Sequence, residues 1–337
     1  MSNRLLTPLR RKLLKSPGTY RNLAIDAAWS MRRAPTERLA LTWPLDPERL
    51  ASVTVRWPAA YLSGTTGLQP MKRSRLARKL GSVRGPISAM VASEVADFAQ
   101  PYPSIVLFEA SIDGVRHEVA IDQRDQLDVD EECADRCLLY FKRQFALEGY
   151  SRANVVPGGY VPLKQETLHR HLAQLRRRRG HELHDVYGRF SLTYSPDVRG
   201  RILELLTGQS RFDFTGGSKL TMYTEYLRDV VASRVCIDVP GVGPLSYRLV
   251  EYLALGSCIV SYPHRARLHV PLVDGEHLVY VAEDLSNLVE LCDRFLSNPG
   301  ERQRLSANAR RYFDMYLHRD QLAAYHLHSI LERAQTV

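Results

Sequence analysis

The stretch PGVGPLSYRLVEYLALGSCIVSYP, residues 240–263, decides how the chain folds. VCIDV just before it and CIVSY at its end are apolar runs of the kind that form buried strands. Between them the spacing predicts a helix that Ser246 caps at its amino end and that Gly256 closes about three turns later. A strand, a helix and a second strand in this order predict a parallel βαβ unit.

The loop PGVGP marks the carboxyl end of the first of these strands, where parallel sheets bind their ligands. Gly241 and Gly243 have no Cβ, so a ligand can approach the backbone closely. The first-turn N–H groups and the helix dipole favour an anion, and the guanidinium of Arg248 suits phosphate. We therefore expect an anion site formed by Gly241, Gly243, Ser246, Tyr247 and Arg248.

Glu251 follows Arg248 by one turn of the expected helix. Its carboxylate only accepts hydrogen bonds, which suits two vicinal hydroxyls of a ribose. The same spacing also fits a surface ion pair between Arg248 and Glu251, which would stabilise the helix by about 0.2–0.5 kcal/mol. Spacing alone leaves both interpretations open.

Strands and helices alternate on both sides of this stretch. We expect helices over 164–178, 197–207, 221–232, 284–296, 300–315 and 319–334, and strands at 188–194, 211–217, 235–239, 258–262 and 277–281. This order predicts a doubly wound parallel sheet with right-handed crossovers.

The chain before residue 156 is less regular. The patterns predict strands at 39–45, 52–58 and on both sides of Asp113-Gly114, a helix around 87–99, and a helix running into a strand over 132–145. VVPGGYVP, 155–162, is typical of a link between domains. We expect an α/β protein with two Rossmann-like doubly wound domains facing a cleft. The divisions are a basic segment 1–35, domains 36–156 and 157–318, and a last helix 319–337 that crosses back to the first domain.

The positive charge is local. The 337 residues have a net charge of +9, of which residues 1–35 carry +7 and residues 71–85 carry +6, so the remainder is mildly acidic at −4. This distribution argues against a nucleic-acid-binding protein. LLTPLRRKLLK in the basic segment is typical of a helix lying on an anionic membrane, with a mobile tail or a helix packed on the body as alternatives.

Two further compositional features bear on location. No apolar run reaches the roughly 18–20 residues of a membrane span. The five cysteines fit no zinc or CxxC spacing, which favours reduced thiols. We expect a cytoplasmic protein that can associate with a membrane surface.

SYRLVEYLALGSCIVSY together with PLVDGEHLVYVAEDL resembles the C-terminal half of GT-B glycosyltransferases. The resemblance is greatest to the group-1-type and spore-maturation-type families, with some likeness to the exostosin pattern. It covers roughly residues 185–335 and fades before 150. The matching positions of R-x-x-E-x-x-x-x-G and of the following D-G and D-L pairs are Arg248, Glu251, Gly256, Asp274, Gly275, Asp284 and Leu285.

The resemblance implies a GT-B fold whose C-terminal domain holds a nucleoside-diphosphate sugar, with no other cofactor and no metal. On this reading Glu251 binds the ribose, while Arg248 and the helix start bind the diphosphate. The N-terminal domain would then receive an acceptor, which is a glycan, a lipid-linked molecule or a small molecule.

Retaining members of these families commonly carry a glutamate eight residues before the ribose-binding one. Gly243 stands at that position here. The departure leaves open whether transfer retains or inverts configuration. It also leaves open a non-catalytic nucleotide- or carbohydrate-binding protein that keeps the fold.

Other candidate residues follow expected strands. Gly216 and Gly217 end FDFTGG, where their backbone amides could contact donor phosphates; a tight turn is the alternative. Sugar transfer needs a base for the acceptor hydroxyl. We expect Asp122 in that role and Asp125 as the second choice, with turn and capping acids as the alternative.

The run Asp128–Asp130 matches the metal-binding D-x-D of the other large glycosyltransferase fold. It lies in an acidic stretch of the kind that begins a helix, and we favour that interpretation.

Overall fold

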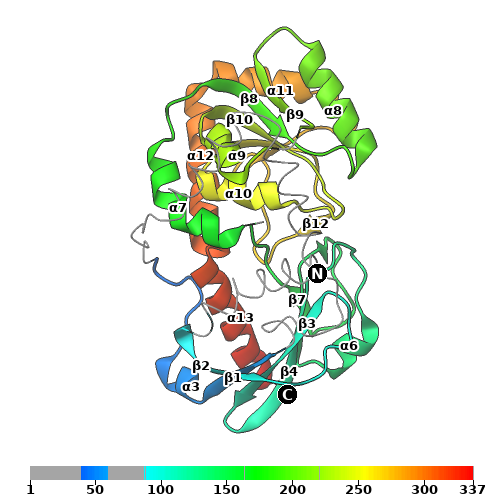
Figure 1. The fold of residues 1–337 in the computed structure, drawn as a ribbon, viewed down its shortest axis with the longest axis vertical. Helices are drawn as coiled ribbons and strands as arrows, with labels where there is room; N and C mark the ends of the chain where they lie inside the picture. The colour runs from blue at the N-terminus through cyan, green and yellow to red at the C-terminus, as the bar shows by residue number, and fades with distance from the viewer. Residues whose placement is uncertain (1–38, 60–86, 88, 163, 220, 337) are drawn as a thin grey trace, which may run out of the picture.

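The structure is a computed structural model that describes residues 39–59, 87, 89–162, 164–219 and 221–336. These form two α/β lobes, one above the other in Figure 1. The basic segment 1–35 and the basic stretch 71–85 lie outside the described residues.

The C-terminal lobe is built on a five-stranded sheet in the order β13-β11-β10-β8-β9, and every neighbouring pair is parallel. The strands are β8 His184–Arg189, β9 Phe214–Gly217, β10 Ser233–Asp238, β11 Cys258–Ser261 and β13 Val279–Tyr280. The helices between and after them are α8 Pro196–Gly208, α9 Tyr223–Val231, α10 Tyr247–Leu255, α11 Leu288–Ser297 and α12 Pro299–Tyr312. The expected doubly wound parallel sheet is confirmed.

The strand order changes direction between β8 and β10. The chain runs from β8 through α8 to β9 on one side, then returns through α9 to β10 on the other side of β8. Ligands of such sheets bind at this switch point, outside the carboxyl ends of the strands. The loops after β8 and β10 lie at this switch point.

The N-terminal lobe contains a mixed six-stranded sheet in the order β2-β1-β3-β4-β5-β7. Its strands are β1 Val53–Pro58, β2 Ala92–Ala96, β3 Ile105–Ile112, β4 Val115–Asp122, β5 Leu139–Lys142 and β7 Val155–Pro157. At the predicted hairpin, Asp113 and Gly114 have φ of 51° and 84°, the positive pair that a two-residue type I′ turn requires. β4, β5 and β7 are parallel, so their carboxyl ends meet at one edge.

Three local expectations are wrong. Residues 39–45 form no strand, and the helix expected over 87–99 is replaced in part by β2, which pairs in parallel with β1. β2 is an exposed edge strand, so its side chains lack the burial pattern that identifies strands. The strand expected at 188–194 is β8, four residues earlier. Val186 and Tyr187 are its buried positions, and the chain turns after Phe190.

The two lobes are joined along the C-terminal helices. α12 continues through a π-helical turn, Phe313–Leu317, into α13, Arg319–Ala334, which crosses to the lower lobe in Figure 1. There Tyr325 donates a hydrogen bond to the Pro157 carbonyl (2.7 Å). One hydrophobic cluster runs from the N-terminal sheet through α13 to α10, and a second fills the space between the C-terminal sheet, α8 and α11.

The remaining elements are short or lie at the junction. They are α3 Pro47–Ala51, α6 Glu131–Arg136, β6 Phe145–Ala146, α7 Gln165–Arg177 and β12 Ala266–Arg267. β6 pairs with β12 and so connects the lobes by backbone hydrogen bonds. Across the described ranges, none of the helices combines the length and the hydropathy needed to span a bilayer.

Candidate functional site

The amino end of α10 lies at the carboxyl edge of the C-terminal sheet. Ser246 caps it as predicted: its Oγ accepts a hydrogen bond from the Leu249 N–H (3.2 Å) and donates one to Asp238 at the end of β10 (2.6 Å). Gly256 ends the helix in the left-handed conformation, with φ of 67°. Both predicted caps are confirmed, so the free N–H groups of the first turn point toward the switch point.

Two arginines lie beside this helix end. Arg199 of α8 is buried and donates through Nε to the Pro240 carbonyl (2.9 Å), while Arg248 of α10 donates to the Val239 carbonyl (2.9 Å). Both guanidinium groups lie against the ring of Phe190, at 5.9 and 5.6 Å from its centroid. The loop after β10 therefore rests on two cations from the two helices that flank the switch point.

The buried carboxylate of Asp238 attracts both arginines, but only from beyond ion-pair distance. Among the residues that the structure describes, no carboxylate forms an ion pair with Arg199 or Arg248, and the Arg248 Nε has no hydrogen-bond partner. Burial and the nearby charge of Arg248 together lower the pKa of Arg199 to about 10, although the charge of Asp238 opposes the shift. Two neighbouring cations at a helix amino end form a site for an anion that carries more than one charge.

A polar network behind this site was not predicted. The Asp238 carboxylate accepts from Ser246 and approaches His264 Nε2 (3.2 Å), while His264 Nδ1 lies 3.0 Å from the Tyr280 hydroxyl. A ring protonated on Nε2 satisfies both contacts, because it donates to Asp238 and accepts from Tyr280. The signal in the sequence was the set of polar residues that end β10 and β11. The contacts among these residues form only in the folded protein, so the sequence alone could not predict them.

Asp238 should make stability depend on pH. Burial by itself would raise the pKa of Asp238, but the hydrogen bond from His264, the charge of Arg248 and the hydrogen bond from Ser246 outweigh it and lower that pKa. A carboxylate with a lowered folded-state pKa stabilises the protein above its unfolded pKa of about 3.9, and this contribution disappears as pH falls through the folded value. We expect Asp238→Asn to lose about 1–3 kcal/mol near neutral pH and much less in acid.

Urea unfolding from about pH 3 to pH 7 measures this difference. The wild-type and variant stabilities should converge as the pH falls. A constant gap between them across that range would contradict the assignment.

Glu251 lies inside the protein rather than on an open surface. It is 2% exposed, and its Oε1 accepts a hydrogen bond from the Tyr223 hydroxyl of α9 (2.7 Å). The Arg248 guanidinium meanwhile donates to Val239. The structure thus places the predicted ribose ligand one turn behind Arg248, at the α9–α10 contact, and its role toward a ribose stays a prediction.

Gly243 is required for packing between the lobes. Gln144, just after β5, accepts from the Leu245 N–H and donates to the Leu245 carbonyl, each at 3.0 Å. A Cβ on Gly243 would lie 2.3 Å from the Gln144 amide nitrogen and 2.6 Å from the Asp125 carbonyl oxygen. A glutamate at this position therefore does not fit the arrangement.

Replacing Gly243 with Ala is expected to lower the free energy of unfolding by about 1–3 kcal/mol, because an ordered backbone or side chain must move. Gly241→Ala is the matched control, since a Cβ there finds its nearest atom at 3.7 Å. Denaturant unfolding of both variants is the measurement. Equal small losses would show that the Gln144 contact is not a constraint in solution.

Tyr247 joins the two lobes at the same place. It is the first residue of α10, and its hydroxyl accepts a hydrogen bond from Arg143 Nη1 in the N-terminal lobe (3.1 Å). The sequence placed Tyr247 in the anion site. In the structure the Tyr247 hydroxyl instead contacts Arg143 of the N-terminal lobe, next to the predicted anion site.

The two glycines of FDFTGG differ in environment. Gly216 has φ of 146°, and a Cβ there would lie 1.9 Å from the Gly188 carbonyl oxygen, so close pairing of β8 with β9 accounts for this glycine. Gly217 has φ of 97°, and no atom lies within 4 Å of an added Cβ. Of the two, Gly217 is the one whose surroundings leave room for a ligand.

The two predicted catalytic acids also differ. Asp122 is fully buried, and its carboxylate accepts from Lys142 Nζ (2.8 Å), the Tyr140 hydroxyl (2.6 Å) and the Arg124 backbone N–H (2.7 Å). The side chain of Asp125 is 36% exposed and pairs with Arg143 at 2.6 Å. The geometry favours Asp125 over Asp122 for contact with an acceptor, although sequence reasoning had preferred Asp122.

The acidic run at Asp128–Asp130 begins a helix. Asp130 caps α6 by accepting from the Cys133 N–H (3.0 Å), and Asp128 pairs with Arg124 (3.0 Å). The interpretation of this run as the charged start of a helix is confirmed.

The site lies within a segment that matches a known family. Residues 165–326, just under half of the chain, match the family model described as glycosyl transferase-like. No curated protein matches the chain. The matched segment contains β8 to β13, both arginines and α10, so the site described above lies in a region of glycosyl transferase-like sequence.

Two solved structures show distant similarity. A glycosyltransferase from Rickettsia africae ESF-5 is 12% identical, with a TM-score of 0.31 over 49% of this chain and 44% of that one. MurG from Acinetobacter baumannii is 10% identical, with a TM-score of 0.35 over 79% of this chain and 80% of that one. The chain thus spans less than half of the Rickettsia protein.

Residues 165–326 therefore resemble a glycosyl transferase-like family, and they include all five strands of the C-terminal parallel sheet.

Proposed function

We propose that the protein transfers a sugar from a nucleoside-diphosphate donor to an acceptor hydroxyl at the junction of its lobes. In this proposal Arg199, Arg248 and the amino end of α10 bind the diphosphate. The observation that carries it is the pair of arginines without a carboxylate partner among the described residues, at the switch point of a glycosyl transferase-like sheet. Charge developing on the leaving diphosphate would be stabilised by groups already in place.

The proposal assigns neutralisation of the diphosphate to protein cations, without a metal ion or another cofactor. Titration calorimetry with UDP, GDP, ADP and dTDP tests it directly. We expect one of the four to bind saturably, more tightly than its monophosphate, and equally well in the presence of EDTA. No binding of any diphosphate at millimolar concentration would contradict the proposal.

A non-catalytic nucleotide- or carbohydrate-binding protein is the second candidate. One observation favours it: Gly243, where retaining relatives are expected to carry an acid, is closed off by Gln144. The two functions differ in turnover. Release of labelled sugar from a nucleotide sugar, to water or to an acceptor, would exclude the binding protein.

We also propose that the acceptor, whether glycan, lipid-linked or small, binds on the side of the N-terminal lobe. The basic segment 1–35 would bring the protein to an anionic membrane surface. Flotation with anionic liposomes, comparing the full chain with one lacking residues 1–35, tests the membrane contact. Equal flotation of the two proteins would overturn it.

A further inference from the structure

A buried carboxylate lies directly behind the proposed anion site. Asp238 ends β10, is 1% exposed, and accepts a hydrogen bond from Ser246, the N-cap of α10 (2.6 Å). Its charge attracts Arg199 and Arg248, but it also repels an anion that binds at the same helix end. A group that offsets the charge of Asp238 when the anion arrives would therefore strengthen binding.

His264 is placed to be that group. It follows β11, and its side chain is 4% exposed. Its Nε2 lies 3.2 Å from the Asp238 carboxylate and 3.1 Å from the Ser261 hydroxyl, while its Nδ1 lies 3.0 Å from the Tyr280 hydroxyl. The next residue, Arg265, is exposed. Both ring nitrogens therefore contact polar groups at the ends of β10, β11 and β13.

This network accommodates the His264 ring in two protonation states. In the neutral ring Nε2–H donates to Asp238, and the Tyr280 hydroxyl donates to Nδ1. In the cationic ring Nδ1–H donates to the Tyr280 oxygen instead, because a hydroxyl both donates and accepts. A proton is thus added without leaving a buried polar atom unpaired. Histidine is also the side chain whose ordinary titration falls between about pH 5 and pH 8.

Charges of both signs surround the ring. Asp238 faces it from β10, and Asp274, which accepts from the Tyr280 N–H (2.9 Å), is a further carboxylate on the β13 side. Both favour a cationic ring, whereas the positive charges of Arg199 and Arg248 near Asp238 oppose it. A diphosphate bound beside these arginines adds negative charge and so favours the cationic ring.

We propose that His264 takes up a proton from solvent when a diphosphate binds at the amino end of α10. The pair formed by Asp238 and His264 then changes from a single negative charge to neutrality, and its repulsion of the diphosphate disappears. His264 acts through Asp238, so it is a positioning residue for the anion site. The inference rests on the proposed diphosphate site, and its test separates the two.

Titration calorimetry with the preferred nucleoside diphosphate, in two buffers of different ionisation enthalpy, measures the protons that binding takes up. The terminal phosphate of the ligand, with a pKa of about 6, can itself lose a proton on binding, so the readout is the difference between wild type and His264→Gln. Glutamine keeps a donor toward Asp238 but does not take up a proton.

We expect the wild type to take up about half a proton more than His264→Gln near neutral pH. Because linkage is reciprocal, the wild-type affinity should fall about 3-fold per pH unit relative to that of the variant as the pH rises above about 7. A side chain that only supported the loop would change the affinity without changing the proton count.

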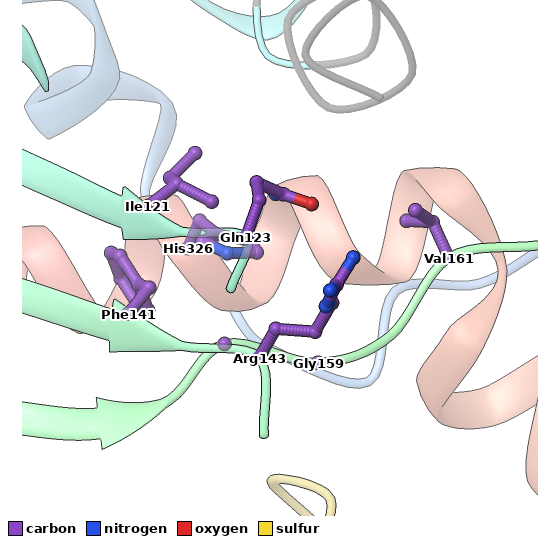
Figure 2. Close-up of a pocket in the computed structure, with 8 residues that line it drawn as sticks. Ile121, Gln123, Phe141, Arg143, Gly159, Val161 and His326 are labelled. Atoms are coloured by element: carbon purple, nitrogen blue, oxygen red, sulfur yellow. The ribbon is translucent and has the colours of Figure 1, made fainter. Parts of the chain in front are cut away.

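Other histidines are distinguishable from this signal. Burial lowers the pKa of His269 to about 3 and that of His326 to about 4, so both stay neutral near neutral pH. His326 lines a small pocket between the ends of β4 and β5 and α13 (Figure 2), where there is room for about one water molecule and none for a nucleotide. His184, at the opposite, amino end of β8, provides the matched control. His184→Gln should leave the proton uptake unchanged.

Equal proton uptake by wild type and His264→Gln would overturn the proposal, as would a loss of uptake in His184→Gln. If His264→Gln does not fold, Tyr280→Phe replaces it, because it keeps the ring but removes the acceptor for Nδ1–H. Its uptake should fall by about half or more, and an uptake equal to that of wild type would contradict the proposal. Absence of any diphosphate binding contradicts the donor site and this inference together, whereas binding without a proton that depends on His264 contradicts this inference alone.

Discussion

Replacing Asp122 with Asn is expected to lower the free energy of unfolding by about 3–5 kcal/mol, because it leaves a buried cation without its partner. Lys142 is completely buried, and its Nζ lies 2.8 Å from the Asp122 carboxylate. Burial lowers the pKa of Lys142, and the charge of Asp122 opposes that shift. Without Asp122 the lysine must lose its proton or remain an unpaired buried charge, and either change destabilises the fold.

The sign of the pH dependence follows from Asp122 itself. Burial acts to raise the pKa of Asp122, but the hydrogen bond from Arg124 and the charge of Lys142 outweigh it, so the pKa is lowered. The stabilisation is therefore present above about pH 4 and is lost as pH falls through the folded-state value.

Urea unfolding at neutral pH measures the loss, and Asp128→Asn is the control. Asp128 pairs with the same Arg124 but its side chain is 64% exposed, so its replacement should cost less than about 1 kcal/mol. An Asp122→Asn variant that keeps its stability but loses sugar transfer would contradict a structural role. It would restore Asp122 as the catalytic base that the sequence suggested.

Replacing Arg248 with Ala is expected to weaken nucleoside-diphosphate binding by about 10- to 100-fold, the effect of losing a charge-assisted hydrogen bond. Its effect on stability should be much smaller, because Arg248 is only half-buried and makes a single hydrogen bond to a backbone carbonyl. Arg248→Lys should recover part of the affinity, since it keeps the charge but loses the planar fork.

Arg199→Ala provides the contrast. Arg199 is buried and holds the carbonyls of Pro240 and Ser191, so its loss should reduce both stability and binding. Calorimetry with the diphosphate that the wild type prefers, together with urea unfolding, separates the two effects. Equal losses of stability and affinity in Arg248→Ala would mean that Arg248 supports the loop without contacting the ligand.

The features that could be predicted from the sequence are those that local chemistry determines. Ser246 and Gly256 bound α10 because a cap needs only neighbours along the chain. Asp113-Gly114 forms its turn for the same reason. The alternation of strands and helices was sufficient to predict the parallel sheet of the C-terminal lobe.

The features that could not be predicted depend on contacts between distant segments. From the sequence, Gly243 was expected to let a ligand approach the backbone. In the structure a larger residue there would collide with Gln144, which packs against this loop from the other lobe. Asp122 was expected to be a catalytic acid because it lies at the end of a strand. In the structure its carboxylate accepts a hydrogen bond from Lys142 on the neighbouring strand β5. The contact of Asp238 with His264 likewise appears only once β10 and β11 lie side by side.

The most direct test of the donor site is a crystal structure with the preferred nucleoside diphosphate carrying sulfur on its β-phosphate, located by anomalous scattering. The account predicts phosphate oxygens within about 3.2 Å of the Arg248 guanidinium and of first-turn N–H groups of α10. A diphosphate bound elsewhere, with Arg248 still on the Val239 carbonyl and the α10 amino end without the ligand, would contradict it.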